Sequence, residues 1–238
     1  MIKLGINGAR GRMGQRIIAL AKDDNNFKVA IGIEHKNHPD IGKVIDTVQI
    51  VSEASEIAIC DCVIDFSSPA ATLEYLPHIV EVKKCLVLGT TGFDSAGHNK
   101  IEEASRSIPI VFSPNMSVGV NLIFKLLGEA AKVLKGYNVT IKEAHHVHKK
   151  DAPSGTAKKI AEIINAQGFG LETANIEAIR KDEIVGNHKV VFESGVDKIE
   201  LSHSAKTRDI FAQGALGAAS WLVGKPAGLY SMNDVLFK

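Results

Sequence analysis

A glycine-rich segment near the start of the chain is the feature that most constrains its fold. Gly8-Ala9-Arg10-Gly11-Arg12-Met13-Gly14 follows an apolar stretch, residues 2–7, and precedes residues 15–22, whose apolar side chains recur at helical spacing. A strand that turns sharply into a helix presents backbone N–H groups at the helix N-terminus, where a phosphate can bind. The segment therefore predicts an α/β fold whose first turn binds the pyrophosphate of a dinucleotide.

An acidic residue further along supports this interpretation. Residues 27–33 read as a second strand, and Glu34 follows it, 20 positions after Gly14. In dinucleotide-binding proteins an acid at this place accepts a hydrogen bond from a ribose hydroxyl. The spacing GxxGxxG differs from the GxGxxG fingerprint, so a tight turn without a ligand stays open as an alternative. His35 and Lys36 could pair with the 2′-phosphate of NADPH, while Glu34 favours NADH, so we expect that either cofactor is used.

Strand-like and helix-like segments alternate through the first half of the chain. The expected strands are residues 61–66, 86–91 and 110–113, and the expected helices are residues 69–82 and 95–107. This alternation predicts a doubly wound parallel sheet, which binds ligands at the carboxyl ends of its strands. Those ends carry small or polar residues that suit a nicotinamide-ribose pocket: residues 66–68, Gly89-Thr90-Thr91 and Ser113-Pro114-Asn115-Met116.

The second part of the chain contains a dense cluster of titratable residues. A helix is expected over residues 118–135 and a strand over residues 137–144, which leads into His145-His146-Val147-His148-Lys149-Lys150-Asp151. Pro153-Ser154-Gly155-Thr156 follows, at the start of a helix expected over residues 157–166. Ser154 or Thr156 can cap this helix, and the N–H groups of Gly155 and Thr156 can bind an anion such as a carboxylate.

Three interpretations of the histidine cluster are open. His145, His146 and His148 are too close in sequence to converge easily on zinc, and no distant set of His or Cys completes a coordination shell, so we expect no metal. A solvated basic loop is the second interpretation. The third is a site with an imidazole proton donor, a lysine counter-charge and a helix N-terminus that binds a carboxylate. Histidine suits such a site because it titrates near neutral pH.

The remaining segments suggest a small sheet and a helix that returns to the first domain. Strands are expected over residues 174–178, 190–193 and 198–202, with turns at Asn187-His188 and Ser194-Gly195. A sheet of this kind suits association between copies of the chain. Residues 210–223 read as a helix rich in small residues.

Composition argues against several partners. The net charge of +1 gives no field that would attract nucleic acid or an anionic membrane. The longest uncharged stretch, residues 107–124, contains two prolines and is not expected to span a bilayer. Cys60, Cys62 and Cys85 lie in or beside apolar stretches and read as buried thiols of a reducing compartment. The N-terminus lacks the pattern of a signal peptide, so we expect a cytoplasmic protein.

Several motifs together resemble those of the 4-hydroxy-tetrahydrodipicolinate reductase (dihydrodipicolinate reductase) family of lysine and diaminopimelate biosynthesis. The longest motif is EAHHVHKKDAPSGTA, and others are GARGRMG, DFSSP, VLGTTGF, SPNMSVGVN, SHSAKTRDIFAQGAL and GLYSMNDVL. The resemblance covers almost the whole chain. It implies NADH- or NADPH-dependent reduction of 4-hydroxy-tetrahydrodipicolinate to tetrahydrodipicolinate by a homotetramer. Each subunit would have a Rossmann-like domain and a second α+β domain with an open mixed sheet.

The resemblance also implies roles for individual residues. His145 matches the proton donor and Lys149 its catalytic partner, and His146, Gly155 and Thr156 match the binders of the cyclic dicarboxylate substrate. The residues that match cofactor contacts are Gly8, Ala9, Arg10, Gly11, Arg12, Met13, Glu34, Gly89, Thr90, Thr91, Ser113, Pro114, Asn115 and Met116. Many members carry arginine directly after the acid, where this chain has His35, which argues against a strong preference for NADPH.

Domain boundaries and a mechanism follow as expectations. Residues 1–116 and 209–238 would bind the dinucleotide, and residues 117–208 would bind the substrate and form tetramer contacts. Hydride would pass from the nicotinamide to C4 of the dehydrated, unsaturated ring, and His145 would supply a proton. Lys149 would support this electrostatically or assist loss of the 4-hydroxyl group. Two rival functions remain: a dehydrogenase acting on an amino-acid semialdehyde, and a protein that binds NAD(P)H without catalysis. The first gives no reason for a site that binds two carboxylates, and the second gives none for a proton donor.

Overall fold

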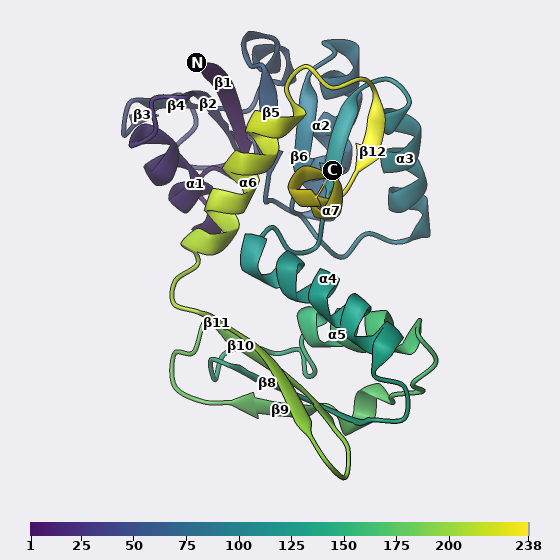
Figure 1. Cartoon of the computed structure of the whole chain (residues 1–238). Coiled ribbons are helices and arrows are strands. Elements are labelled where there is room, and N and C mark those ends of the chain that lie inside the picture. The colour runs from purple at the N-terminus through teal and green to yellow at the C-terminus, as the bar shows by residue number, and fades with distance from the viewer. Residues whose placement is uncertain (238) are drawn as a thin grey trace. The chain divides into compact units, whose positions relative to one another are not determined.

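The computed structural model describes residues 1–237, which divide into two compact units (Figure 1). Unit 1 comprises Met1–Ser117 and the segment from Phe211 onward, and unit 2 comprises Val118–Ile210. Each unit contains helices and one β-sheet. In the described part of the chain, the helices are all too short or too polar to cross a membrane.

The sheet of unit 1 has eight strands in the order β12-β7-β6-β5-β1-β2-β4-β3. They are β1 (Ile2–Asn7), β2 (Phe27–Ile33), β3 (Val44–Ile45), β4 (Val48–Val51), β5 (Cys62–Asp65), β6 (Cys85–Leu88), β7 (Pro109–Phe112) and β12 (Gly228–Tyr230). Neighbouring strands are parallel, except that β3 and β4 form an antiparallel hairpin. A parallel sheet is buried on both faces, which explains why β6 is apolar throughout.

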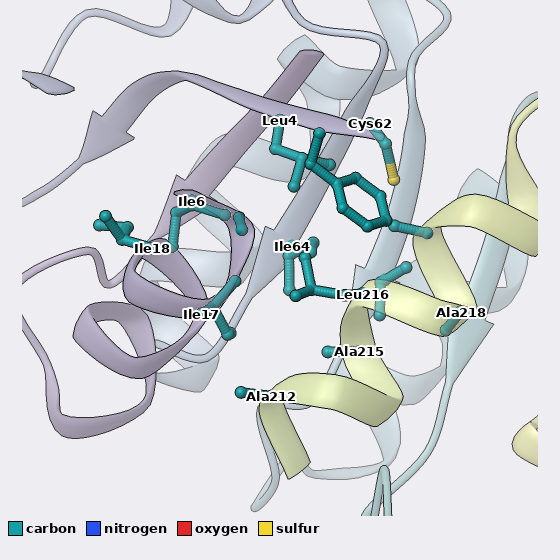
Figure 2. Close-up of a cluster of buried hydrophobic side chains, with 14 of the residues drawn as sticks. Leu4, Ile6, Ile17, Ile18, Cys62, Ile64, Ala212, Ala215, Leu216 and Ala218 are labelled. Carbon is teal, nitrogen blue, oxygen red and sulfur yellow. The ribbon is translucent and has the colours of Figure 1, made fainter. Parts of the chain in front are cut away.

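Helices cover both faces of this sheet. One face packs against α1 (Arg12–Lys22), α6 (Asp209–Leu222) and α7 (Met232–Phe237). The other face packs against α2 (Pro69–Glu81), α3 (Ser95–Ser105) and the 3₁₀ helix η1 (Ala54–Ile59). Figure 2 shows the first of these cores, in which Ile17 of α1 and Ala215 of α6 lie around Ile6 and Ile64 of the strands. The predicted doubly wound parallel sheet is confirmed.

Small residues allow α6 to approach the loop after β7 closely. An added Cβ at Gly214 would lie 1.7 Å from the carbonyl oxygen of Met116. Met116 is itself 1% exposed and belongs to the same core. The backbone of α6 thus supports the backbone of this loop directly.

Unit 2 contains a four-stranded mixed sheet in the order β11-β10-β8-β9. Its strands are β8 (Asn138–His145), β9 (Glu177–Arg180), β10 (Gly186–Glu193) and β11 (Lys198–Ala205). The pairing of β8 is antiparallel with β10 and parallel with β9. Helices α4 (Val118–Val133) and α5 (Gly155–Asn165) share a hydrophobic core with β8 and β10, and a 3₁₀ helix, η2 (Thr173–Asn175), precedes β9. The second α+β unit with a mixed sheet is also as predicted.

Some local predictions are wrong. Asn187-His188, predicted as a turn, lies inside β10, where His188 is buried. The strand expected over residues 174–178 is replaced by η2 followed by β9. Strands β3, β4 and β12 were not predicted, and β3 and β12 have only two and three residues, too few to show alternation. The three cysteines are buried free thiols, as expected.

Candidate active site

The glycine-rich turn of unit 1 connects β1 to α1. Gly8 has a left-handed backbone (φ 77°), and an added Cβ there would lie 2.7 Å from the carbonyl oxygen of Phe66. The Cβ of a residue replacing Gly14 would lie 2.1 Å from the carbonyl oxygen of Gly8. Gly11 is the N-cap of α1 and has no side chain that could cap the helix. An anion can therefore bind the first N–H groups of α1.

A cleft of about 640 Å³ lies beside this turn. Its lining includes Gly8, Arg10, Gly11, Glu34, His35, His38, Ser67 and Tyr75. The volume is in the range of small-molecule sites. Four of the residues predicted to contact the cofactor thus surround one cleft, whereas Ala9 is fully buried, and Arg12 and Met13 form the first turn of α1.

Glu34 and Arg10 are linked at the rim of this cleft. The Oε1 atom of Glu34 accepts a hydrogen bond of 2.7 Å from the backbone N–H of Arg10. The side chain of Arg10 pairs with Asp40, from Nε to Oδ2 at 2.9 Å, and Lys43 pairs with the other oxygen of Asp40 at 3.1 Å. The hydrogen bonds from Lys43 and Arg10 hold the pKa of Asp40 below its usual value. Asp40 therefore already neutralises the positive charge of Arg10 at the rim of the cleft.

A buried carboxylate connects the ends of the central strands. Asp65 at the end of β5 accepts hydrogen bonds from Asn7 Nδ2 at 2.8 Å, Ser67 Oγ at 2.6 Å and Thr90 Oγ1 at 2.8 Å. These bonds compensate the burial of the Asp65 carboxylate and hold the carboxyl ends of β1, β5 and β6 together. Asn7 and Asp65 were not predicted as site residues. Polar side chains at the ends of otherwise apolar strands were the available signal.

The other predicted cofactor residues follow β6 and β7, farther along the same carboxyl edge. An added Cβ at Gly89 would lie 2.3 Å from the ring of Phe66. Ser113 Oγ donates to the carbonyl oxygen of Asn115 at 2.8 Å, which shapes the loop that contains Pro114 and Met116. Thr91 is exposed beside the buried Thr90. Together these features fit a bound dinucleotide. The turn has no room for Cβ atoms, the start of α1 is uncapped, and an acid and a cleft lie beside it.

In unit 2 the strand period brings a carboxylate and an imidazole into the interior. Val139, Ile141, Glu143 and His145 alternate along β8, so they share the face that packs against α4 and α5. The first two contribute to the hydrophobic core, whereas Glu143 (1% exposed) and His145 (8% exposed) extend this face as a polar site. A buried carboxylate is costly unless it is fully paired, so its partners define the site.

Three groups donate hydrogen bonds to Glu143. Arg180 on β9 binds both oxygens, from Nη2 to Oε1 at 2.8 Å and from Nη1 to Oε2 at 3.0 Å. The backbone N–H of Ser154, before α5, donates to Oε1 at 3.0 Å. The third partner is His145, whose Nδ1 is hydrogen-bonded to Oε2. An ionised carboxylate only accepts, so Nδ1 carries a proton and Nε2 is the nitrogen left for a ligand.

The pKa shifts agree with this assignment. Burial raises the pKa of Glu143, but the hydrogen bonds from Arg180 and His145 outweigh it and hold that pKa below its usual value. Burial lowers the pKa of His145, and the charges of Lys149 and Arg180 lower it further against the opposing effect of Glu143. In the free protein near pH 7, Glu143 is therefore ionised and His145 is mostly neutral.

His188 on β10 completes the buried group. It pairs in register with Glu143, and its ring lies 5.2 Å from that of His145 in an edge-to-face arrangement. Burial, together with the proximity of His145, lowers its pKa to about 4, so His188 is neutral at physiological pH. Sequence reasoning missed Glu143, Arg180 and His188 as site residues. The alternation of side chains along β8 could have indicated that Glu143 is buried. Its partners Arg180 and His188 lie on strands that are distant in the sequence.

The loop between β8 and α5 carries the other predicted residues. Lys149 Nζ pairs with Asp151 Oδ1 at 2.7 Å, and His146 is half-buried. Ser154 caps α5 by accepting a hydrogen bond of 3.2 Å from the N–H of Ala157, as predicted. Gly155 and Thr156 are the first residues of α5, and an added Cβ at Gly155 would meet nothing within 4 Å. The start of α5 thus has open space beside the cationic loop.

Metal binding was one interpretation of the histidine cluster. Within residues 1–237, no three His, Cys, Asp or Glu side chains are grouped so that they could hold a metal ion. His148 is exposed and lies 3.6 Å from Glu183. A buried imidazole that is hydrogen-bonded to a carboxylate can take part in acid–base chemistry.

Two family models match adjoining parts of the chain. Residues 2–116 match "Dihydrodipicolinate reductase, N-terminus", and residues 119–236 match "Dihydrodipicolinate reductase, C-terminus". The 4-hydroxy-tetrahydrodipicolinate reductase of Syntrophotalea carbinolica is 39% identical, with 99% of each chain covered. The enzyme of the same name from Aquifex aeolicus is 41% identical over 99% of this chain and 98% of its own.

Solved structures show the same architecture. The dipicolinate-bound dihydrodipicolinate reductase from Paenisporosarcina sp. TG-14 has a TM-score of 0.82 at 22% identity, with 97% of each chain covered. The aspartate dehydrogenase from Thermotoga maritima has a TM-score of 0.55 at 15% identity, covering 95% of this chain and 98% of its own. At these identities the likeness concerns the fold.

Proposed function

The chain belongs to the dihydrodipicolinate reductase family, and we propose that it reduces 4-hydroxy-tetrahydrodipicolinate to tetrahydrodipicolinate with NADH or NADPH. It is an oxidoreductase of lysine and diaminopimelate biosynthesis, so the resemblance read from the sequence is confirmed. The observation that carries the proposed chemistry is the buried His145, held by Glu143 beside the cationic loop and the open start of α5.

Unit 1 supplies the residues that would hold the dinucleotide. The glycine-rich turn, residues 8–13, would let the pyrophosphate approach the first backbone N–H groups of α1, because the N–H groups of residues 8–11 already donate within the chain. Glu34 would accept a hydrogen bond from a ribose hydroxyl. Gly89-Thr90-Thr91 and residues 113–116 would contact the nicotinamide half. When bound, the reduced nicotinamide would supply a hydride to C4 of the unsaturated ring that remains once the 4-hydroxyl group has left as water.

Unit 2 supplies the residues that would bind and protonate the substrate. Its two carboxylates would be bound by His146, Lys149 and the N–H groups of Gly155 and Thr156. A dianion near Nε2 of His145 favours the protonated ring, so binding would raise the pKa that burial lowers in the free protein. His145 then donates this proton as negative charge develops along the conjugated C=C–C=N system, and Lys149 stabilises that charge.

We also propose that the protein is a cytoplasmic homotetramer that does not bind nucleic acid. The outer face of the unit 2 sheet supports self-association. It is opposite the face packed on α4 and α5, and its side chains on β8, such as Thr140 and Lys142, are exposed in the single chain. The net charge of +1 offers no general attraction for nucleic acid.

The test of the function is reductase activity on enzymatically generated substrate. Oxidation of NADH or NADPH, followed by its near-ultraviolet absorbance, should require that substrate. A semialdehyde dehydrogenase would instead respond to an amino-acid semialdehyde, and a protein that only binds NAD(P)H would show a binding signal without oxidation. Either result would contradict the proposed function.

Cofactor choice gives a first mutational prediction. Asp40 neutralises Arg10 at the rim of the cleft, so Asp40→Asn should free a cation for the 2′-phosphate of NADPH. Ion pairs near the surface make small contributions, so kcat/KM for NADPH relative to NADH should rise by only roughly 5-fold. Asp46→Asn, which removes a charge from the exposed hairpin turn, is the matched control. An unchanged ratio in Asp40→Asn would show that Arg10 does not approach the phosphate.

A further inference from the structure

We propose that Glu143 and Arg180 are positioning residues for His145. Together they fix the imidazole so that Nδ1 always carries a proton and Nε2 alone exchanges one with the substrate. The expected effects on turnover rest on the reductase function proposed above. The position of the proton on His145 in the free protein does not depend on that function.

The hydrogen-bond partners of Glu143 hold its carboxylate in place. Its carboxylate has no solvent-exposed surface, and both of its oxygens are bound. One oxygen also accepts from the backbone N–H of Ser154, so the start of α5 is tied to the end of β8. A carboxylate fixed on both oxygens sets the plane and orientation of the imidazole that it contacts, as carboxylates do for other catalytic histidines.

Arg180 supplies the counter-charge for Glu143. Arg180 also donates to the carbonyl oxygens of Asp151 at 2.6 Å and Ile179 at 2.7 Å, which fixes its guanidinium. A guanidinium is permanently charged, so it keeps Glu143 ionised and therefore an acceptor for Nδ1–H. The bond to Asp151 also attaches the loop that carries Lys149. Arg180 thus connects the proton donor to the loop proposed to bind the substrate.

Four titratable or charged groups face the imidazole of His145. They are Glu143 on the same strand, Arg180 on β9, His188 on β10 and Lys149 on the following loop. Glu143 alone among these four is an anion, and Arg180 offsets its charge. The free ring therefore stays mostly neutral, and a dianionic substrate would supply the negative charge that favours the imidazolium.

Gly186 on β10 keeps Nε2 clear of side chains on that strand. An added Cβ there would lie 3.0 Å from this nitrogen. Proton donation from Nε2 of an imidazolium leaves a neutral ring with its proton on Nδ1, the form that Glu143 binds. With the opposite tautomer, loss of the Nε2 proton from a neutral ring would leave an imidazolate, which is a much poorer product. The buried pair therefore determines which nitrogen can act as the acid.

The kinetic test is Glu143→Gln, with Glu177→Gln as the matched control on the neighbouring strand. Glutamine keeps the shape but can donate its N–H to Nδ1, which favours the wrong tautomer. We expect kcat to fall by about 10²-fold or more, with NADH affinity unchanged. Removing the carboxylate also disfavours the imidazolium, so activity should decline with rising pH from a lower pH than in the wild type. If the Glu143→Gln variant had the same kcat and the same pH profile as the wild type, the proposal would be overturned.

The structural test does not require activity. Nitrogen chemical shifts of the histidines in the free, ¹⁵N-labelled protein report which nitrogen carries the proton. We expect His145 in the wild type and in Glu177→Gln to carry it on Nδ1, and Glu143→Gln to lose that preference. A wild-type ring protonated on Nε2 would overturn the positioning role even if the protein is the expected reductase. A protonated Nδ1 in a protein without reductase activity would contradict the proposed function and leave the positioning role standing.

A second variant covers the case in which Glu143→Gln does not fold because Arg180 is left unpaired. Glu143→Gln combined with Arg180→Met removes both charges, which buried pairs tolerate far better than the loss of one. The double variant should fold and keep the low kcat. Recovery of wild-type turnover would show that the pair serves only stability, and this outcome would overturn the proposal.

Discussion

His145→Gln is expected to lower kcat by about 10²–10⁴-fold, the usual contribution of a well-placed general acid. Glutamine can fill the space beside Glu143, but it cannot deliver a proton near neutral pH. The negative charge that develops on the substrate ring would then have to be neutralised from solvent. Cofactor binding should change little, because the glycine-rich turn and Glu34 belong to unit 1 and His145 belongs to unit 2.

Steady-state kinetics with enzymatically generated substrate, and titration of NADH by fluorescence, would measure both quantities. His148→Gln is the matched control, since its imidazole lies in the same loop region but is exposed and lies near Glu183. The control should keep kcat within about 2-fold, as substitutions at exposed positions generally have small effects. Normal turnover in His145→Gln would remove this residue from the mechanism.

The sequence was informative where a signal is local. The glycine-rich turn and Glu34 lie within one strand-turn-helix-strand unit, and the structure places Gly8, Gly11 and Glu34 around one cleft. Alternating strands and helices predicted the doubly wound sheet, because strands such as β5 and β6 are largely apolar and lie between segments with helical spacing. The two-residue strand β3 and the three-residue strand β12 were missed because they are too short to show a pattern.

In the candidate site of unit 2, the sequence did not identify the residues that surround His145. The motif around His145 predicted the proton donor, yet the carboxylate two residues earlier was read only as part of a strand. Arg180 lies 37 residues from Glu143 and reaches it because β9 pairs in parallel with β8. His188 was assigned to a turn, although the antiparallel register of β10 places it opposite Glu143. The spacing of apolar and polar residues within a strand does not show which distant strand it pairs with.

Gly214→Ala is expected to be the most damaging of the conservative substitutions in unit 1. The new Cβ would lie 1.7 Å from the carbonyl oxygen of Met116, and both partners are backbone or directly attached to it, so no side-chain rotation relieves the clash. Overpacking of a core costs about 1–3 kcal/mol and occasionally more, and we expect a loss of about 3 kcal/mol in the free energy of unfolding. Displacement of residues 113–116 should also weaken NADH binding.

Gly217→Ala in the same helix separates this clash from the general effect of replacing a helical glycine. Gly217 is exposed, and an added Cβ would meet nothing within 4 Å. Alanine is favoured over glycine inside a helix by about 0.5–1 kcal/mol, so this control should be slightly more stable than the wild type. Denaturant unfolding of the three proteins would measure the difference. Because α6 approaches the loop through its own backbone, the two variants should shift stability in opposite directions, and equal shifts would mean that α6 does not support that loop.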